Sequence, residues 1–170
     1  MHKGSAHVFS EIFLHLNFHC HRDRPMIRSE IEPALHEAIL AFCRATKGAH
    51  PIAVGGTESH IHLVFQMEPL LNLSQFIGQV KGRSAHDINE QFGRDTLRWQ
   101  RGFGIVSFAK RNLPGLVAYV TNQKQHHAAG TTREILEQYN RWIEGAQDEG
   151  SGEEGEEGRG ASEDEEEKPR

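Results

Sequence analysis

The sequence contains little cysteine, no long apolar run and no segment typical of export. Only Cys20 and Cys43 occur among 170 residues, and they do not form a C-x-x-C pair, which argues against a disulfide framework and against a thiolate zinc site. No apolar stretch approaches the roughly 20 residues that cross a bilayer, and no basic segment followed by an apolar run stands near the start. We therefore expect a cytoplasmic protein that does not enter a membrane.

Apolar residues are also scarce at the C-terminal end, where acidic residues dominate. Residues 144–170 carry 12 acidic side chains against Arg159, Lys168 and Arg170, a net charge of −9, whereas residues 1–143 carry +4. A segment without apolar periodicity cannot bury a core. We predict one folded domain over residues 1–143 and a disordered acidic tail over 144–170. The basic charge of the domain suits a polyanionic partner.

The pattern of apolar residues predicts an α+β domain. Alternation with a period of two indicates strands, and apolar residues at i, i+3, i+4 and i+7 indicate amphipathic helices. In chain order the expected elements are a strand over 7–21, a helix from Ile31 to Cys43 that ends by Gly48, strands over 51–54 and 59–67 joined at Gly55 and Gly56, a helix from Leu73 to Ile88, and a strand over 103–109. This βαββαβ order is the ferredoxin-like motif, an antiparallel sheet with both helices on one face.

Two more helices are expected after this unit. The first is a C-terminal helix on which Tyr119 and Gln123, four residues apart, share one face. Thr131 and Glu134 then form a capping-box pattern, which predicts that a last helix starts there and continues to residue 143. Tyr139 has the apolar spacing of this last helix and is expected to pack, so Tyr119 is the tyrosine that packing does not explain.

Two histidines one residue apart, His60 and His62, lie in the second strand of the predicted hairpin. On a strand they point to one face, while Ile61, Leu63 and Phe65 point to the other. The two helices would cover the apolar face and leave the histidines on an open face, where a substrate could lie. Two neutral imidazoles side by side each offer a lone pair to a divalent metal ion. The alternative is a chance spacing, because the chain has 12 histidines.

Three motifs occur in a fixed order along the chain. They are the His-hydrophobic-His strand (His60–His62), the Trp-Gln-x-Gly-aromatic-Gly segment (Trp99–Gly104), and Tyr-x-x-Asn-Gln (Tyr119–Gln123) followed by paired histidines. Together they resemble the single-tyrosine HUH transposases of small bacterial insertion sequences, the insertion-sequence-200-like group, over residues 7–143. One departure is Ser59, where the family usually has an aspartate that can orient an imidazole.

The resemblance implies a metal-dependent transposase that acts on single-stranded DNA at hairpin ends. It assigns Tyr119 as the catalytic nucleophile and His60, His62 and Gln123 as the ligands of Mg²⁺ or Mn²⁺, which accept nitrogen and oxygen donors. An aryl ester of the DNA 5′ phosphate keeps the energy of the broken bond, so another 3′-hydroxyl can attack it without ATP. The resemblance also implies a homodimer, in which the Tyr119 helix of one subunit can complete the histidine site of the other.

Basic side chains near these motifs are candidates for DNA contacts. These candidates are Lys81, Arg83, Arg98, Arg101, His126 and His127. Each of the four long cations is equally compatible with ordinary surface charge or with a phosphate contact. The two histidines could instead interact with the dipole at the C-terminal end of their helix.

Two other functions fit the same sequence. A host-retained relative would process repeat hairpins by the same chemistry, and only its genomic neighbourhood would separate it from the transposase of a mobile element. A non-catalytic ferredoxin-like nucleic-acid-binding module would carry stacking aromatic side chains on the open face of its sheet. This chain has His60 and His62 on that face instead, which disfavours the second alternative.

We expect deletion of residues 144–170 to leave cleavage intact and to tighten non-specific DNA binding. The net charge changes from −5 to +4, and phosphate contacts dominate non-specific affinity. A tethered acidic segment competes with DNA at high effective concentration, so the gain should shrink as salt rises. Fluorescence anisotropy with an unrelated single strand at low and moderate salt measures the effect. Equal affinities of the two proteins at low salt would show that the tail does not reach the DNA site.

Overall fold

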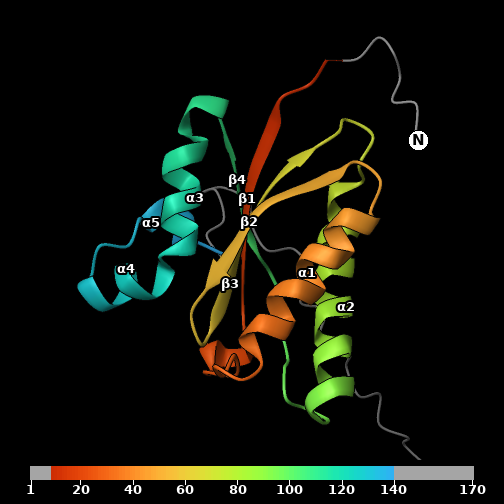
Figure 1. The fold of residues 1–170 in the computed structure, drawn as a ribbon, viewed down its shortest axis with the longest axis vertical. Coiled ribbons are helices and arrows are strands. Elements are labelled where there is room, and N and C mark those ends of the chain that lie inside the picture. The colour runs from red at the N-terminus through yellow and green to blue at the C-terminus, as the bar shows by residue number, and fades with distance from the viewer. Residues whose placement is uncertain (1–8, 140–170) are drawn as a thin grey trace, which may run out of the picture.

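Four antiparallel strands form the sheet of this protein in a computed structural model that describes residues 9–139 (Figure 1). The strands are β1 (Ile12–His19), β2 (Ala49–Gly56), β3 (His60–Met67) and β4 (Gly104–Phe108), and their order across the sheet is β2-β3-β1-β4. This is the order of the ferredoxin-like motif, so the predicted α+β fold class is confirmed. The predicted acidic tail over 144–170 lies outside the described residues.

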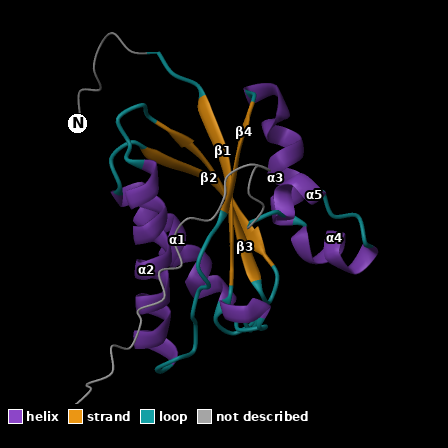
Figure 2. Ribbon diagram, turned by 180° about the vertical axis from the view of Figure 1, so that it is seen from behind, coloured by secondary structure: helices purple, strands orange, loops and turns teal. Residues whose placement is uncertain are grey.

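Helices cover both faces of the sheet (Figure 2). The pair formed by α1 (Glu32–Ala45) and α2 (Leu73–Phe92) lies on one face, and α3 (Leu113–Thr121) packs on the other against β2 and β3. The shorter elements are η1 (His21–Asp23), η2 (Lys110–Asn112), α4 (Gln123–Ala129) and α5 (Glu134–Glu137). None of the helices within residues 9–139 combines the length and the apolar character needed to cross a membrane.

Two elements end earlier than the sequence pattern predicts. β1 ends at His19, because the chain turns through Arg22 and Asp23, whose φ angles are 57° and 52°. The last helix is limited to α5, so its predicted continuation is wrong at Gln138 and Tyr139. The expected capping box is also absent there, since the residue before the first turn is Arg133 and it makes no side-chain cap.

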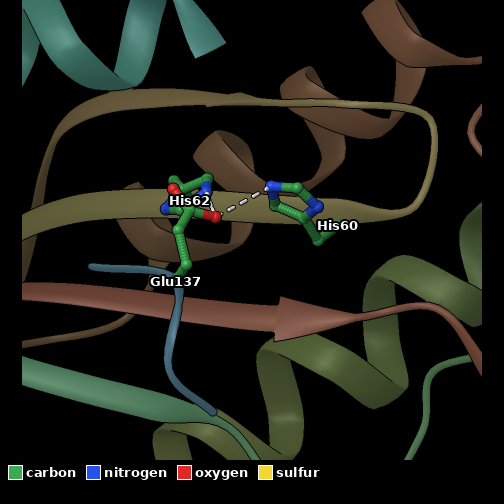
Figure 3. Close-up of side chains that lie close together, drawn as sticks. All are labelled: His60, His62 and Glu137. Atoms are coloured by element: carbon green, nitrogen blue, oxygen red, sulfur yellow. Dashed lines mark ion pairs between the residues drawn. The ribbon is translucent and has the colours of Figure 1, made fainter. Parts of the chain in front are cut away.

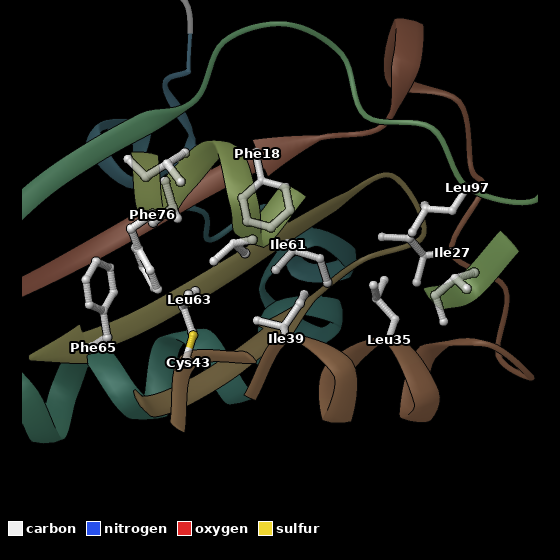
Figure 4. Close-up of a cluster of buried hydrophobic side chains, with 14 of the residues drawn as sticks. Phe18, Ile27, Leu35, Ile39, Cys43, Ile61, Leu63, Phe65, Phe76 and Leu97 are labelled. Carbon is white, nitrogen blue, oxygen red and sulfur yellow. The ribbon is translucent and has the colours of Figure 1, made fainter. Parts of the chain in front are cut away.

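The larger apolar core lies between the sheet and the α1–α2 pair (Figure 4). Ile61, Leu63 and Phe65 on β3 are fully buried in it, as the alternation of that strand predicts. Cys20 and Cys43 belong to the same core, and burial raises the pKa of both thiols to about 12. Both cysteines are therefore packing residues, which agrees with the absence of any cysteine motif.

The opposite face of the sheet is closed, so the expectation of an open histidine face is wrong. His60 is 3% exposed and His62 is fully buried, because a smaller core forms between this face and α3 around Val64 and Val120. The close approach of α3 depends on Gly55 in β2, where a Cβ atom would overlap with the carbonyl oxygen of Val120. A glycine inside a strand is a common sign of another backbone passing close by.

We expect Gly55→Ala to lower the free energy of unfolding by roughly 1 to 3 kcal/mol, because the added methyl group forces α3 away from the sheet. Gly78→Ala on α2 is the matched control. A Cβ at Gly78 has no atom within 4 Å, and alanine in a helix interior is favoured over glycine by about 0.5 to 1 kcal/mol. Urea unfolding of both variants measures the difference. Equal effects of the two changes would show that α3 does not pack closely on β2.

Candidate active site

A row of polar side chains from two neighbouring strands occupies the covered face of the sheet. His15, Asn17 and His19 alternate along β1, and the antiparallel register places Asn17 opposite His62 and His19 opposite His60. All five are at most 8% exposed. A buried polar group costs free energy unless it has a hydrogen-bond partner. The covering elements must therefore supply partners as well as apolar surface.

One ring nitrogen of each predicted metal-binding histidine is engaged by a neighbour. His62 Nδ1 lies 2.7 Å from His15 Nε2, and His60 Nδ1 lies 2.9 Å from Thr57 Oγ1 and 3.3 Å from Ser59 Oγ. The family resemblance leads one to expect an aspartate at position 59. Here the hydroxyl groups of Thr57 and Ser59 contact the His60 imidazole instead. Burial lowers the pKa of both His15 and His60 to about 3, and the nearby His62 adds to the effect. Both rings are therefore neutral at pH 7.

The other ring nitrogen of each of these two histidines faces a carboxylate (Figure 3). Glu137 Oε2 lies 3.4 Å from both His60 Nε2 and His62 Nε2, and the three ligand atoms lie within 4.8 Å of one another. Neither Nε2 atom has a hydrogen-bond partner among the described residues. If a cation were bound, with the ring protons on Nδ1, each Nε2 atom would offer it a lone pair and Glu137 would offer a carboxylate oxygen in the same buried space.

The two distances from Glu137 Oε2 to the imidazole nitrogens fit a divalent metal ion. Two ligand atoms that are each about 2.1 Å from one ion lie about 3.0 to 3.4 Å apart at octahedral and tetrahedral angles. Both separations from Glu137 Oε2 fall at the upper end of this range. The donor set of two imidazoles and one carboxylate also suits such an ion, because neutral imidazole binds transition metals and carboxylate oxygen binds hard cations.

Gln123, the third predicted ligand, is buried beside Tyr119. Its Oε1 atom has no hydrogen-bond partner among the described residues, and its Nε2 atom lies 3.5 Å from the Tyr119 carbonyl oxygen. The single helix expected here is interrupted at Asn122, which separates α3 from α4. Among residues 9–139, five buried side-chain atoms lack a partner, and the predicted ligand atoms of His60, His62 and Gln123 are three of them. The role of Gln123 as a ligand stays a prediction.

Tyr119 is 2% exposed and lies next to the histidine pair. Its hydroxyl donates a short hydrogen bond to Glu137 Oε1 and accepts one from the Arg133 backbone N–H at 2.9 Å, and its ring centroid is 6.2 Å from that of His62. Burial raises the pKa of Tyr119, the Arg133 bond opposes the rise, and the Glu137 bond adds to it. The phenol is therefore protonated at pH 7.

Glu137 connects the phenol with the imidazoles. Burial raises the pKa of this carboxyl, but its interactions with His62, Tyr119 and His60 outweigh burial and lower the pKa to about 2. Glu137 therefore carries a negative charge at pH 7. One oxygen of this carboxylate accepts a hydrogen bond from the Tyr119 hydroxyl, and the other faces the Nε2 atoms of His60 and His62.

Residues 133–139, which we call the strap, hold Glu137 over the sheet. Asn17 Nδ2 donates a hydrogen bond to the Leu136 carbonyl oxygen at 2.6 Å, and Asn17 Oδ1 accepts one from the Gly104 N–H at 2.8 Å. A Cβ atom at Gly104 would overlap with the carbonyl oxygen of Gln138. The strap can approach β4 this closely because Gly104 has no side chain.

Tyr139 fixes the far end of the strap and explains why α5 is short. Its ring centroid lies 3.9 Å from that of His19, and its hydroxyl donates a hydrogen bond to Asp23 Oδ2 at 3.1 Å. These contacts place Tyr139 on the polar row of the sheet. A continued helix would carry the side chain elsewhere, so the tertiary contact prevails over the local helical pattern.

The paired histidines after Gln123 also join the site. His127 Nε2 lies 3.5 Å from Glu137 Oε2, and its ring centroid is 4.9 Å from that of His60. His126 packs its ring 4.7 Å from that of Tyr119 and pairs through Nδ1 with the Thr131 hydroxyl at 2.9 Å. Both residues thus line the site, and their contact with DNA stays a prediction.

The other predicted DNA contacts lie in different surroundings. Lys81 donates hydrogen bonds to the carbonyl oxygens of Gln100 and Gly102, at 2.8 and 2.7 Å, and so ties α2 to the segment before β4. Arg83 pairs with Asp87 on the exposed side of α2, in the helix layer opposite the histidines. Arg101 is exposed. Their DNA-binding roles stay predictions.

Sequence reasoning missed His15, Thr57 and Glu137 as members of the site. His15 could have been identified from the sequence, because it alternates with Asn17 and His19 along the first strand just as His60 alternates with His62. Thr57 lies three residues before His60, within reach of its Nδ1. No pattern in the sequence points to Glu137, because its position depends on how the strap folds back over the sheet.

Comparison with known proteins places the sequence in one family. The sequence matches the family described as "Transposase IS200 like" over residues 8–123. The transposases for insertion sequence element IS200 of Salmonella typhimurium and Salmonella typhi are each 30% identical to it over 77 residues, which is 42% of this chain and 50% of each relative. The aligned region therefore spans half the length of these relatives.

Two solved structures share the fold. A Deinococcus radiodurans protein described as a transposase has a TM-score of 0.56 and 18% identity, covering 72% of this chain and 98% of its own. A REP-associated tyrosine transposase bound to a REP hairpin has a TM-score of 0.53 and 14% identity, covering 75% of this chain and 74% of its own. At these identities the likeness concerns the fold alone.

We expect the stability of the protein to fall as the pH drops below about 6.5. His15 and His60 have a pKa of about 3 when folded and about 6.5 when unfolded, so between these values the unfolded chain binds more protons. The loss should be roughly 1 kcal/mol per histidine for each pH unit below about 6.5. Urea unfolding at pH 7 and pH 5.5 measures it.

His15→Gln should flatten this pH dependence, because it removes one buried titrating group and keeps an acceptor for His62. His86→Gln on the exposed surface of α2 is the matched control and should leave the profile unchanged. A profile that responds equally to both changes would contradict the buried, neutral state of His15.

Proposed function

This chain belongs to the IS200-like transposase family, and we propose that it nicks and rejoins single-stranded DNA in a metal-dependent reaction through a 5′-phosphotyrosine on Tyr119. The observation that carries the proposal is the position of one carboxylate. Glu137 contacts both the Tyr119 hydroxyl and the Nε2 atoms of His60 and His62. The proposed nucleophile and the two imidazoles proposed to bind the metal, far apart in the sequence, thus contact the same carboxylate.

His60, His62 and Glu137 would hold Mg²⁺ or Mn²⁺, and the family resemblance adds Gln123 as an oxygen donor. Mn²⁺ accepts imidazole nitrogen more readily than Mg²⁺ does, and both accept carboxylate and amide oxygen. When bound, the ion supplies positive charge to the non-bridging oxygens of the scissile phosphate. His60 is neutral and Glu137 is negatively charged at pH 7, which are the protonation states that a metal ligand needs.

The reaction at Tyr119 is a transesterification. The phenol oxygen attacks the scissile phosphorus, and the bond from phosphorus to the 3′ oxygen breaks. The phenol loses its proton and the released 3′ oxygen gains one, so the DNA leaves with a free 3′-hydroxyl. The fragment that keeps the 5′ phosphate stays bound to Tyr119 as an aryl ester, which a second 3′-hydroxyl can attack to join the strands.

Tyr119 reaches the histidines of its own chain, which supports nicking within a single subunit. We propose that a homodimer, as implied by the family resemblance, brings two such sites together so that two DNA ends can be exchanged. A cytoplasmic location, where bacterial DNA is accessible, is part of the proposal.

A non-catalytic sheet-binding module is disfavoured, because the face that would bind bases is buried under α3 and the strap. A host-retained relative that processes repeat hairpins would use the same residues and the same chemistry. This alternative is retained because a structurally similar tyrosine transposase is bound to a REP hairpin. The DNA that this protein cleaves would distinguish a host-retained relative from the transposase of a mobile element.

We expect the protein to form an SDS-resistant adduct with single-stranded DNA that carries its hairpin end, in the presence of Mn²⁺ or Mg²⁺. Tyr119→Phe should abolish the adduct and leave DNA binding intact, because it removes only the nucleophilic oxygen. Gel electrophoresis with DNA labelled on the 3′ side of the cut, the part that keeps the 5′ phosphate, measures the adduct.

Tyr139→Phe is the matched control, since it removes the other tyrosine hydroxyl and leaves Tyr119 in place. His62→Ala should abolish the adduct and also weaken Mn²⁺ binding measured by calorimetry without DNA. An adduct that persists in Tyr119→Phe and disappears in Tyr139→Phe would contradict the assignment of the nucleophile.

A further inference from the structure

Three arginines that have no ion-pair partner among residues 9–139 lie beside the proposed active site. Arg22 and Arg24 stand in the turn after β1, and Arg98 precedes the segment that leads into β4. The His21 N–H donates a hydrogen bond to the Arg98 carbonyl oxygen at 2.8 Å, which holds these two segments side by side. All three arginine side chains are exposed. Within residues 9–139 none of them pairs with a carboxylate, whereas Arg44 and Arg83 do.

The three guanidinium groups act on the same neighbour. Partial desolvation lowers the pKa of His21, and the positive charges of Arg98, Arg22 and Arg24 lower it further. The nearest acid in the turn, Asp23, is engaged with His19 and Tyr139 rather than with the arginines. Like charges that gather without acidic partners repel one another, and a polyanion relieves the repulsion.

The turn that presents Arg22 and Arg24 is held in a costly conformation. Arg22 and Asp23 both adopt the left-handed region, with φ angles of 57° and 52°, which non-glycine residues rarely occupy and which tertiary contacts must maintain. Asp23 supplies those contacts through His19 Nδ1 at 2.8 Å and through the Tyr139 hydroxyl. His19 in turn stacks on His60 with ring centroids 4.7 Å apart. The turn that carries the exposed arginines is thus connected to the histidine site through Asp23 and His19.

A groove continues from Arg98 along the surface. It has a volume of about 460 Å³ and runs past Trp99 and Arg101 to Lys81 on α2, with Asp95 as its one carboxylate. A strand that leaves the active site over Arg22 and Arg24 would find further positive charge in this direction.

We propose that Arg22, Arg24 and Arg98, here called the arginine patch, bind backbone phosphates of the DNA strand whose scissile phosphate enters the active site. The proposal rests on the function proposed above for that site. The phosphates can belong to the single-stranded flank or to the stem of a hairpin, because both present the same charged oxygens. The patch contributes affinity and direction rather than sequence recognition, since phosphate contacts position a nucleic acid without reading its bases.

The test compares two variants with the same change in net charge. Arg22→Gln, Arg24→Gln and Arg98→Gln are combined in one full-length protein. The control combines Arg44→Gln, Lys47→Gln and Lys110→Gln, which lie at the other end of the sheet, where Ile12 pairs with Met67 and Phe13 with Phe108. Binding to an unpaired oligonucleotide and to a blunt hairpin is measured by anisotropy without divalent metal, over a range of salt concentrations.

The patch variant should lose about 0.7 in the slope of log affinity against log salt for each phosphate contact to a single strand, or about 0.9 for a duplex stem. A loss of about 2 with the unpaired oligonucleotide assigns the patch to the single-stranded flank. A loss confined to the hairpin assigns it to the stem. Equal slopes for the patch and control variants with both DNAs would overturn the proposal.

A second variant guards against misfolding. Arg22→Gly removes one charge and places glycine where φ is 57°, a conformation that glycine adopts without strain. It should lower the slope by the value of one contact and keep the thermal unfolding midpoint at or above that of the unmodified chain. An unchanged slope in this folded variant would also overturn the role of Arg22. A protein that binds DNA through the patch and forms no covalent adduct would leave this inference standing and contradict the proposed nicking reaction.

Discussion

The burial of polar side chains on one face of the sheet is the constraint on which the rest of this structure depends. His15, Asn17 and His19 from β1 meet His60 and His62 from β3 in a space closed to solvent. An apolar layer over this face would leave Asn17 Nδ2 and the Nε2 atoms of His60 and His62 facing no polar group, at a considerable cost in free energy for a domain of this size. The cover must therefore be polar at the right points, and the elements that close the face are the same ones that build the site.

Each covering element supplies a particular group to this face. α3 brings the Tyr119 hydroxyl, the turn before β3 brings Thr57, and the strap brings the Glu137 carboxylate and the Leu136 carbonyl oxygen. Two close backbone approaches, at Gly55 and Gly104, make this arrangement possible. Stability and chemistry are consequently not separable here, because removing a site residue also removes the partner of a buried polar group.

The sequence predicts the parts of this molecule that depend on local periodicity. Alternation along β3 separates Ile61, Leu63 and Phe65 from the histidines, and the helical spacing of α1 and α2 identifies the elements that cover the apolar side. The closure of the other side is not predictable in this way, because it depends on contacts such as Asn17 with Leu136, which lie 119 residues apart. The use of a charged side chain is equally hard to predict. Lys81 bonds to backbone carbonyl groups within the fold, whereas Arg22 and Arg24, which belong to no motif, have no ion-pair partner in the part of the chain that the structure describes.

The order in which the chain is synthesised gives the strap a further significance. Asn17 and His19 are made early, yet their partners Leu136 and Tyr139 come at the end of the described residues. At about 5 to 20 residues per second, roughly 6 to 24 seconds separate the two ends on the ribosome. The apolar core of α1, α2 and the sheet can assemble in that interval, while the polar face still waits for its cover. The polar face is therefore closed only after residues 133–139 have been made, and a nascent chain, or one truncated before the strap, has a sheet but no complete site.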